Sequence, residues 1–383
     1  MDNTVAQRKL GEHKIARIDF QPIADNWGRA IGPNSKGGHG GQTGGSSKAA
    51  VITTDGDVTG WAMAGGATGE IRKFIGASVG GLFDAQRGLA PDAPWWLDKV
   101  MHDLAARIIG IPVWQMLGAA GPREVPLYSG AIYFDDLIPE QSPRGVPGLL
   151  ANCRMDYDAG YRAFKLKVGR GRNAMNAEEG LHRDIEVVRA VRLNFPDCRI
   201  LADANDGWTV DQALKFVADT AECDLYWIEE PFEESCDALK RLRDGIAKTG
   251  KKILIADGEG RRDKADTPTE YGGYTTAFIE NLYALAAEKL IDVFLLDLDI
   301  LGFSRWRTVM PKLAAAGVKA SPHTWMWRMR SFYTAQLAAG VGNIDIVEGI
   351  PGRTDAVDES AFAMKNGRLV MPEAHGFGLK LKQ

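Results

Sequence analysis

The chain has 383 residues, of which 45% are hydrophobic and 25% are charged, a composition typical of a folded globular protein. This length allows two domains or one large barrel with additions. The net charge of −4 argues against a nucleic-acid-binding surface and gives no reason to expect a membrane surface. No apolar run approaches the roughly 20 residues of a spanning helix. The N-terminal residues lack the apolar core of a signal peptide, and the four cysteines form no CxxC pair, so we expect a cytoplasmic protein with reduced thiols.

The first part of the chain is predicted to be rich in β-structure. Residues 14–23 read as a strand, and residues 48–65 read as two strands around a turn at Asp55 and Gly56. Between them, the glycine-rich residues 32–47 are expected to be too flexible to form core. From about Pro94 the apolar spacing becomes helical, and it stops near Gly110 and Pro112.

From about Val125 the chain alternates short apolar runs with helical segments such as 181–195 and 209–222. The runs lie at 125–130, 163–169, 199–205, 224–230, 252–259, 292–299, 317–323 and 343–349. This alternation predicts a parallel α/β barrel. An open doubly wound sheet is the alternative, but no glycine-rich dinucleotide fingerprint follows any of the runs. The last stretch, 366–381, is expected to form a hairpin outside the barrel.

Polar residues collect at the C-terminal ends of the predicted barrel strands. In a barrel these ends converge on one mouth, where active sites form. A single such residue often caps the following helix, but capping does not explain a series on consecutive strands. We therefore predict a shared active site built from Lys165, Lys167, Asp203, Asn205, Glu229, Glu230, Asp257, Glu259, Asp297, Asp299, His323 and Glu348.

Three carboxylates on adjacent predicted strands indicate a metal site. Asp203, Glu229 and Glu259 would repel one another unless a cation lies between them. All-oxygen ligands suit Mg²⁺. Asp257 competes with Glu259 for the third position, because alternation places both on the same face. Salt bridges to the lysines are the alternative explanation.

Candidate acid–base groups lie on both sides of this metal site. Lys167 lies beside Lys165 and near the expected cation, and both positive charges favour a neutral amine that can act as a base. His323 ends a later strand, and Asp297, one strand earlier, could hold its imidazole in one tautomer. A metal-bound substrate would then have a base on each side.

The motifs together resemble the enolase superfamily, specifically its mandelate racemase subgroup, over nearly the whole chain. FKLKVG is similar to the KxK motif, LADAND to the DxN motif and WIEEP to the second-ligand motif, while DGEG resembles the third-ligand pair and favours Glu259. DLDILGFSRW resembles the segment of the dyad aspartate, which favours Asp297 over Asp299, although Gly302–Phe303 replaces the usual Gly-Gly. SPHTW resembles the histidine motif, and DIVEG places Glu348 where the family keeps an electrophilic glutamate.

This resemblance implies a (β/α)7β barrel over residues 125–350 with an α+β capping domain. Residues 1–124 would form the capping domain, and residues 351–383 would return to it. It also implies Mg²⁺ and abstraction of a proton α to a carboxylate. Lys165 and a protonated Glu348 would then offset the charge of the enediolate. Family members often assemble as dimers or octamers, so we expect a homo-oligomer.

We expect an acid-sugar dehydratase that acts on an aldonate or aldarate. A racemase or epimerase with the same chemistry is the alternative, and a catalytically silent sugar-acid-binding protein is a third possibility. The predicted lid around residues 15–45 is polar, which suits a polyhydroxy acid. The residues expected to bind the substrate are Trp27, Arg29, His39, Tyr133, Asn205, Trp325 and Arg328.

Overall fold

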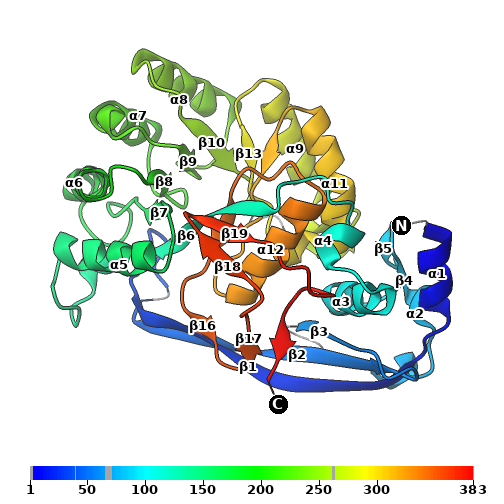
Figure 1. Ribbon diagram of the computed structural model, residues 1–383. Helices are drawn as coiled ribbons and strands as arrows, with labels where there is room; N and C mark the ends of the chain where they lie inside the picture. The colour runs from blue at the N-terminus through cyan, green and yellow to red at the C-terminus, as the bar shows by residue number, and fades with distance from the viewer. Residues whose placement is uncertain (1–2, 39, 65–70, 261–263, 383) are drawn as a thin grey trace.

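The computed structural model describes residues 3–38, 40–64, 71–260 and 264–382, and within these ranges eight parallel strands form a barrel (Figure 1). The barrel closes where β15 pairs with β6 and where Ala320 bridges Ile344. The predicted barrel is confirmed, and an open sheet is excluded. The strands are β6 (Glu124–Ile132), β7 (Ala163–Lys167), β8 (Arg199–Asp203), β9 (Trp227–Glu229), β10 (Leu254–Asp257), β13 (Val293–Phe294), β14 (Lys319–Ala320) and β15 (Val347–Gly349).

One helix or more follows each strand before the next, which gives the (β/α)7β arrangement. Four of the described helices, α6 to α9, are each preceded by an N-cap residue. Its side chain accepts a hydrogen bond from the backbone N–H three residues later, and the four N-caps are Asn176, Thr209, Ser235 and Thr275. The helices that cover the barrel are α5 (Val146–Asp158), α6 (Ala177–Asn194), α7 (Val210–Asp219), α8 (Cys236–Lys248), α9 (Thr276–Ala287), α11 (Phe303–Ala315) and α12 (Arg328–Gly340).

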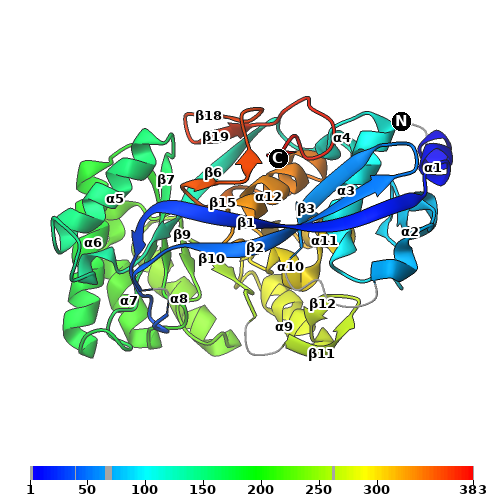
Figure 2. The same ribbon diagram turned by 90° about the horizontal axis from the view of Figure 1, so that it is seen from below.

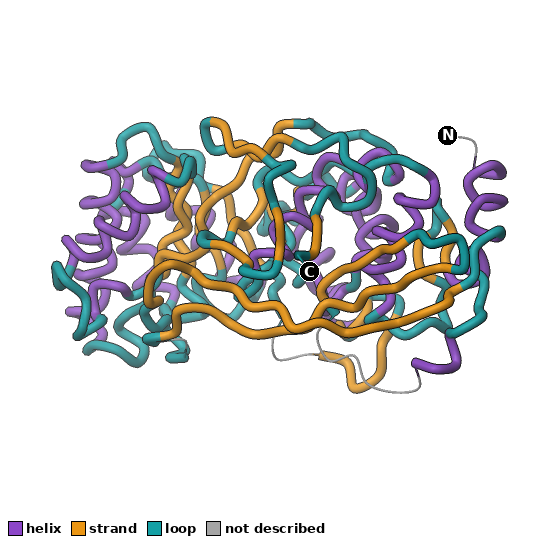
Figure 3. The backbone as a smooth tube through the Cα atoms, turned by 60° about the horizontal axis from the view of Figure 1, so that its bottom comes forward, coloured by secondary structure: helices purple, strands orange, loops and turns teal. Residues whose placement is uncertain are grey.

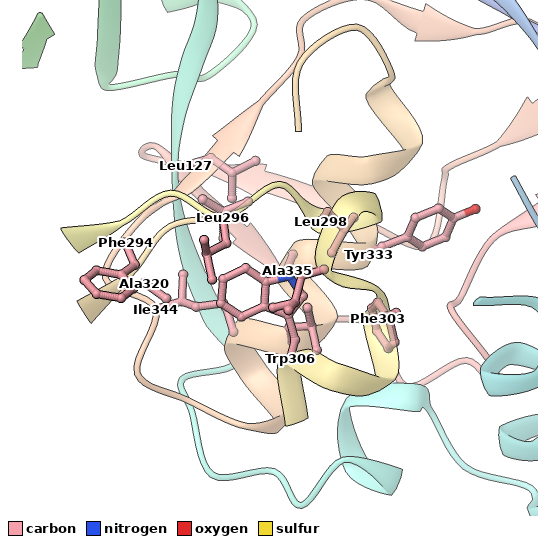
Figure 4. Close-up of a cluster of buried hydrophobic side chains, with 14 of the residues drawn as sticks. Leu127, Phe294, Leu296, Leu298, Phe303, Trp306, Ala320, Tyr333, Ala335 and Ile344 are labelled. Atoms are coloured by element: carbon pink, nitrogen blue, oxygen red, sulfur yellow. The ribbon is translucent and has the colours of Figure 1, made fainter. Parts of the chain in front are cut away.

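The core between helices and strands is apolar. Figure 4 shows one part of it, where Trp306 of α11 and Ala335 of α12 lie among Phe294, Leu296 and Ala320. All five side chains are buried, and burial of this kind supplies most of the folding free energy. Inside the barrel, a smaller apolar cluster that includes Tyr128, Leu201 and Trp227 lies below the mouth.

The N-terminal segment forms an antiparallel sheet that lies along the barrel. Figure 2 shows its two long strands side by side across the molecule, and Figure 3 shows helices behind this sheet as well as near its ends. β16 from the C-terminal segment pairs with β1. The elements are α1 (Asn3–Gly11), β1 (Ile15–Ile31), β2 (Gln42–Thr54), β3 (Thr59–Met63), α2 (Val79–Leu82), β4 (Phe83–Asp84), β5 (Gly88–Leu89), α3 (Leu97–Ile109), α4 (Val113–Met116) and β16 (Arg353–Thr354).

The glycine-rich stretch 32–47 is more ordered than predicted. β1 continues to Ile31, and β2 begins at Gln42, so part of the expected flexible run is strand. The reason is close approach of the backbones: a Cβ on Gly44 would lie 1.9 Å from the carbonyl oxygen of Asp25, and a Cβ on Gly45 would lie 2.9 Å from Trp327. These glycines allow the hairpin to pack where any side chain would clash.

The C-terminal hairpin also differs from the prediction. β18 (Ala363–Lys365) and β19 (Arg368–Val370) turn at Asn366 and Gly367, both with positive φ, but β19 pairs with β6 and so extends the barrel sheet. The other described elements are α10 (Leu298–Leu301), β11 (Lys264–Thr269), β12 (Gly272–Tyr274), β17 (Val357–Asp358) and β20 (Lys380–Leu381). The boundaries proposed at 124/125 and 350/351 stay a prediction.

None of the four cysteines, all of which lie in the described ranges, forms a disulfide. No described helix is both long and apolar enough to cross a membrane.

Candidate active site

Strand register places the predicted site residues at one level of the barrel mouth. Lys167 pairs with Asp203 across β7 and β8, and Asp203 pairs with Glu229 across β8 and β9. Because side chains alternate along a strand, these residues share the inward face with Lys165 and with the interior cluster below. The lysines therefore point into the barrel rather than into water.

Lys165 lies among three carboxylates and is almost fully buried. Its Nζ is 2.7 Å from Glu229 Oε1, 3.0 Å from Glu348 Oε1 and 3.2 Å from Asp203 Oδ2. Burial alone would lower the pKa of Lys165, but the negative charges, led by those of Glu229 and Glu348, raise that pKa well above its usual range. Lys165 is thus a fixed positive charge at the mouth.

Lys167 also contacts Asp203, but its other contacts differ from those of Lys165. Its ammonium pairs with Asp203 and donates to Asn205 Oδ1 at 2.9 Å, and it lies 5.2 Å from the ring centre of Tyr133. Asn205 and Tyr133, predicted to bind the substrate, therefore also orient Lys167. The two lysines of the KxK strand thus share Asp203 and otherwise contact different residues.

The predicted metal ligands are carboxylates, whose oxygen atoms suit a divalent cation such as Mg²⁺. Burial and the adjacent charge of Asp203 raise the pKa of Glu229 well above its usual range, although the two lysines oppose this shift. Burial would also raise the pKa of Asp203, but Lys167 and Lys165 hold it far below normal. A cation with oxygen ligands would relieve the repulsion between these two carboxylates.

The same ligands are not gathered around a single point. Within the described ranges, no three His, Cys, Asp or Glu side chains are arranged to hold a metal. Lysine ammonium groups lie against Asp203 and Glu229, whereas Glu259 Oε1 lies 3.5 Å from His323 Nε2. Binding a cation would therefore require these side chains to turn toward one another.

Gly258 lies between Asp257 and Glu259, the two candidates for the third metal ligand, and directs their side chains to different places. Its φ of +110° bends the chain after β10, and Glu259 then reaches the mouth beside His323. Asp257 instead lies near Glu230, Glu234 and Asp206, and burial together with these negative charges raises the pKa of Asp257 well above its usual range. We therefore assign the third position to Glu259 as a proposal.

His323 and Asp297 form a hydrogen-bonded pair on the other side of the mouth. Nδ1 of His323 lies 3.0 Å from Asp297 Oδ2, while Asp297 Oδ1 accepts the backbone N–H groups of Asp299 and Ile300. Burial would raise the pKa of Asp297, but the charges of Arg330 and His323 hold it well below its usual range. Asp297 is therefore a carboxylate that orients the imidazole.

Glu348 differs from the protonated acid that the family resemblance implies. Its Oε2 accepts the backbone N–H of Thr324 at 2.7 Å, and its Oε1 faces Lys165. Burial would raise the pKa of Glu348, yet Lys165 and His323 lower it, so the carboxylate form is favoured here. Gly130 makes room for this side chain, because a Cβ there would lie 2.5 Å from Glu348 Oε1.

Three residues predicted to contact the substrate pack against or pair with other residues of the chain, and their substrate contacts stay predictions. Trp27 is buried against Trp325, with ring centres 5.4 Å apart. The buried Arg29 forms an ion pair with Asp156 at 2.6 Å.

Arg328 pairs with Glu359 at 2.8 Å and does not line the cavity at the mouth. Single-sequence spacing does not reveal these distant partners. His39 lies outside the described residues.

A cavity of about 1400 Å³ opens at the mouth, between the barrel and the N-terminal segment. Arg330 was missed by the sequence reasoning, although it lies only seven residues after His323, at the start of α12. Its Nη1 is 3.5 Å from Asp297 Oδ2. Among the cavity-lining residues are Tyr133, Glu259, Asp297, His323, Trp325 and Arg330.

Comparison with known proteins agrees with this architecture. The model of the family described as enolase C-terminal domain-like matches residues 148–383. A galacturonate dehydratase from Geobacillus sp., solved with D-galacturonate and 5-keto-4-deoxy-D-galacturonate, is 29% identical with a TM-score of 0.85, over 97% of this chain and 95% of that chain.

Two further proteins are similar over most of their length. A mandelate racemase/muconate lactonizing protein from Geobacillus sp. Y412MC10, complexed with magnesium and tartrate, is 28% identical with a TM-score of 0.86, over 97% and 94% of the two chains. The D-galactarolactone cycloisomerase of Agrobacterium fabrum is 24% identical, over 97% of this chain and 89% of that protein. Together with the family match and the barrel, these likenesses show that the chain belongs to the enolase superfamily, in its mandelate racemase subgroup.

Proposed function

We propose that this protein is a magnesium-dependent dehydratase of an acid sugar. The observation that carries the proposal is the pair of opposed acid–base groups, Lys167 and His323, on either side of a cluster of carboxylates. Lys167 ends β7, and His323 follows β14. Around the barrel, β6 and β15 lie between these two strands on one side, and the four other strands lie between them on the other. The two groups can therefore approach one substrate carbon from different sides.

Substrate binding would use the fixed charge of Lys165. A sugar carboxylate placed at Lys165 would bind the same ammonium group that Glu229 and Glu348 contact, and would replace part of their contacts with it. Mg²⁺ held by Asp203, Glu229 and Glu259 would supply Lewis-acid stabilisation of negative charge on the substrate carboxylate. A substrate carboxylate near Glu348 would also raise the pKa of Glu348 by like-charge repulsion, which favours its hydrogen-bond-donating form.

Dehydration then needs two proton transfers. Lys167 or His323 takes the proton from the carbon next to the carboxylate, and the electrons of that C–H bond enter the enediolate. The electrons return as the bond to the hydroxyl on the following carbon breaks, and the other acid–base group gives that hydroxyl a proton, so water leaves. The enol then gains a proton at the deoxy carbon, loses its hydroxyl proton to solvent and becomes a 2-keto-3-deoxy acid, counted from the carboxylate.

The test is a screen of acid sugars with a reagent for 2-keto acids. D-Galacturonate is the first compound to test, because a similar protein was solved with it and its keto-deoxy product. We expect keto product with Mg²⁺ and none after chelation. Retention of full turnover in metal-free protein would contradict the assignment of the ligands.

Racemisation is the second candidate, and the same opposed groups favour it. If the second group returns a proton to the α-carbon instead of protonating a hydroxyl, the configuration inverts. In D₂O, deuterium in recovered substrate without keto product would support the racemase over the dehydratase. Assembly as a dimer or octamer and location in the cytoplasm stay predictions.

A further inference from the structure

Charges of alternating sign, either buried or half-buried, connect the capping helix α3 to the His323–Asp297 pair. The ammonium of Lys99 on α3 contacts Asp299. The other oxygen of Asp299 lies 2.7 Å from Arg330 Nη2, and Nη1 of Arg330 lies 3.5 Å from Asp297 Oδ2. The same oxygen of Asp297 binds the imidazole of His323.

This chain of charges is shielded from solvent. The Lys99, Asp299, Arg330 and Asp297 side chains are exposed by only 8%, 18%, 16% and 9%, which limits screening by water and salt. Two cations and two anions give a net charge of zero. Removing Lys99 would leave two carboxylates, only two positions apart in sequence, to share Arg330 alone.

The guanidinium position depends on this balance. Arg330 is closer to Asp299 than to Asp297, and its Nη1 also donates to the carbonyl oxygen of Trp325 at 3.3 Å. Without Lys99, the uncompensated charge of Asp299 would draw Arg330 away from Asp297. Asp297 would then lose one of the two groups that fix its Oδ2 atom.

A second contact from the capping sheet reaches the same part of the barrel. Asp25 of β1 accepts the backbone N–H of Arg328, the first residue of α12, at 2.6 Å. The loop before α12 carries His323, and Met326 within it has a φ of +80°. The capping segment therefore contacts both the start of α12 and, through Asp299, its Arg330 side chain.

We propose that Lys99 and Arg330 are positioning residues for His323, and that Lys99 acts through Asp299 and Arg330. The charge chain makes the capping segment part of the acid–base apparatus on the histidine side. This inference rests on the proposed role of His323, but its test does not require a substrate.

The test follows the imidazole tautomer by NMR in Mg²⁺-loaded protein labelled with ¹⁵N-histidine. Long-range ¹⁵N–¹H correlations report which ring nitrogen carries the proton, and the His323→Asn variant identifies the signals of His323. We expect the native protein to hold the Nδ1–H tautomer that Asp297 stabilises. Lys99→Met should lose this single tautomer and give a mixture, whereas Lys99→Arg should restore it.

Arg107→Met is the matched control on the same helix. Arg107 pairs with Asp103 at 2.7 Å and lies outside the charge chain, so this variant should keep the native tautomer of His323. A general loosening of α3 would instead affect both variants. If Lys99→Met does not fold, Lys99→Gln removes the same charge from Asp299 with a polar side chain, and the same outcomes apply.

The proposal is overturned if a folded Lys99→Met or Lys99→Gln protein keeps the single native tautomer, or if Arg107→Met loses it equally. Failure of the proposed function is distinguishable from this result. If only the proposed function is wrong, the tautomer of His323 would still respond to Lys99→Met, although the protein converts no acid sugar.

Discussion

Replacement of Lys165 by methionine should destabilise the protein strongly. Methionine has a similar length but no charge, and Lys165 is only 1% exposed, so solvent cannot compensate for the loss. Asp203 keeps its contact with Lys167, while Glu229 and Glu348 lose their nearest cation. Breaking a buried ion pair by removing one partner costs about 3–5 kcal/mol, and we expect a loss of this size in the free energy of unfolding.

Denaturant unfolding of metal-free protein at neutral pH measures this loss. Lys215→Met is the control, because Lys215 and Asp219 form an exposed pair that should contribute at most about 1 kcal/mol. Added Mg²⁺ should recover more stability in Lys165→Met than in the native protein, because the cation no longer competes with an ammonium for Glu229. A Lys165→Met protein within about 1 kcal/mol of the native one would refute the picture of a charge-balanced mouth.

Four further variants test separate parts of the site. Lys167→Ala and His323→Asn should each lower turnover by about 10²–10⁴-fold, as expected for loss of a general acid–base, and unchanged turnover in either variant would contradict the two-sided mechanism. Gly130→Ala should displace Glu348, whose Oε1 would lie 2.5 Å from the new Cβ, and reduce turnover about 100-fold. It should also lower the melting temperature, because the displaced carboxylate loses its place beside Lys165, and unchanged turnover would contradict the role of Glu348. Because the folded pKa of Asp297 is depressed, its contribution to stability is present above its unfolded pKa of about 3.9 and is lost as pH falls toward the folded value. Unfolding experiments between about pH 5 and about pH 3 should therefore show a smaller loss of stability in Asp297→Asn than in the native protein, and equal losses would contradict the depressed pKa.

The barrel could be predicted from the sequence because its physical signals are local. Short apolar runs that end in polar residues alternate with helices that begin at capping residues such as Asn176 and Thr209. The positions of Lys167, Asp203 and Glu229 then follow from parallel register alone. Each of these signals lies within a few residues of the element that it specifies.

Features that depend on distant partners could not be predicted in this way. The charge of Arg29 suggested a substrate contact, but its partner Asp156 is 127 positions away. Glycine content suggested a flexible lid around Gly44, whereas the residue allows two backbones to approach closely. Arg330 showed no motif, because its role depends on contacts with Asp297 and Asp299 that only the folded chain creates.

The central claim is that the barrel mouth, loaded with Mg²⁺, removes a hydrogen from the carbon beside a sugar carboxylate. The most direct measurement follows that hydrogen by ¹H NMR in D₂O, for D-galacturonate and a library of mono- and diacid sugars. The account predicts that at least one acid sugar loses the signal as a 2-keto-3-deoxy product forms, and that chelation stops the loss. Retention of the α-hydrogen in every acid sugar by folded, Mg²⁺-loaded protein would contradict it.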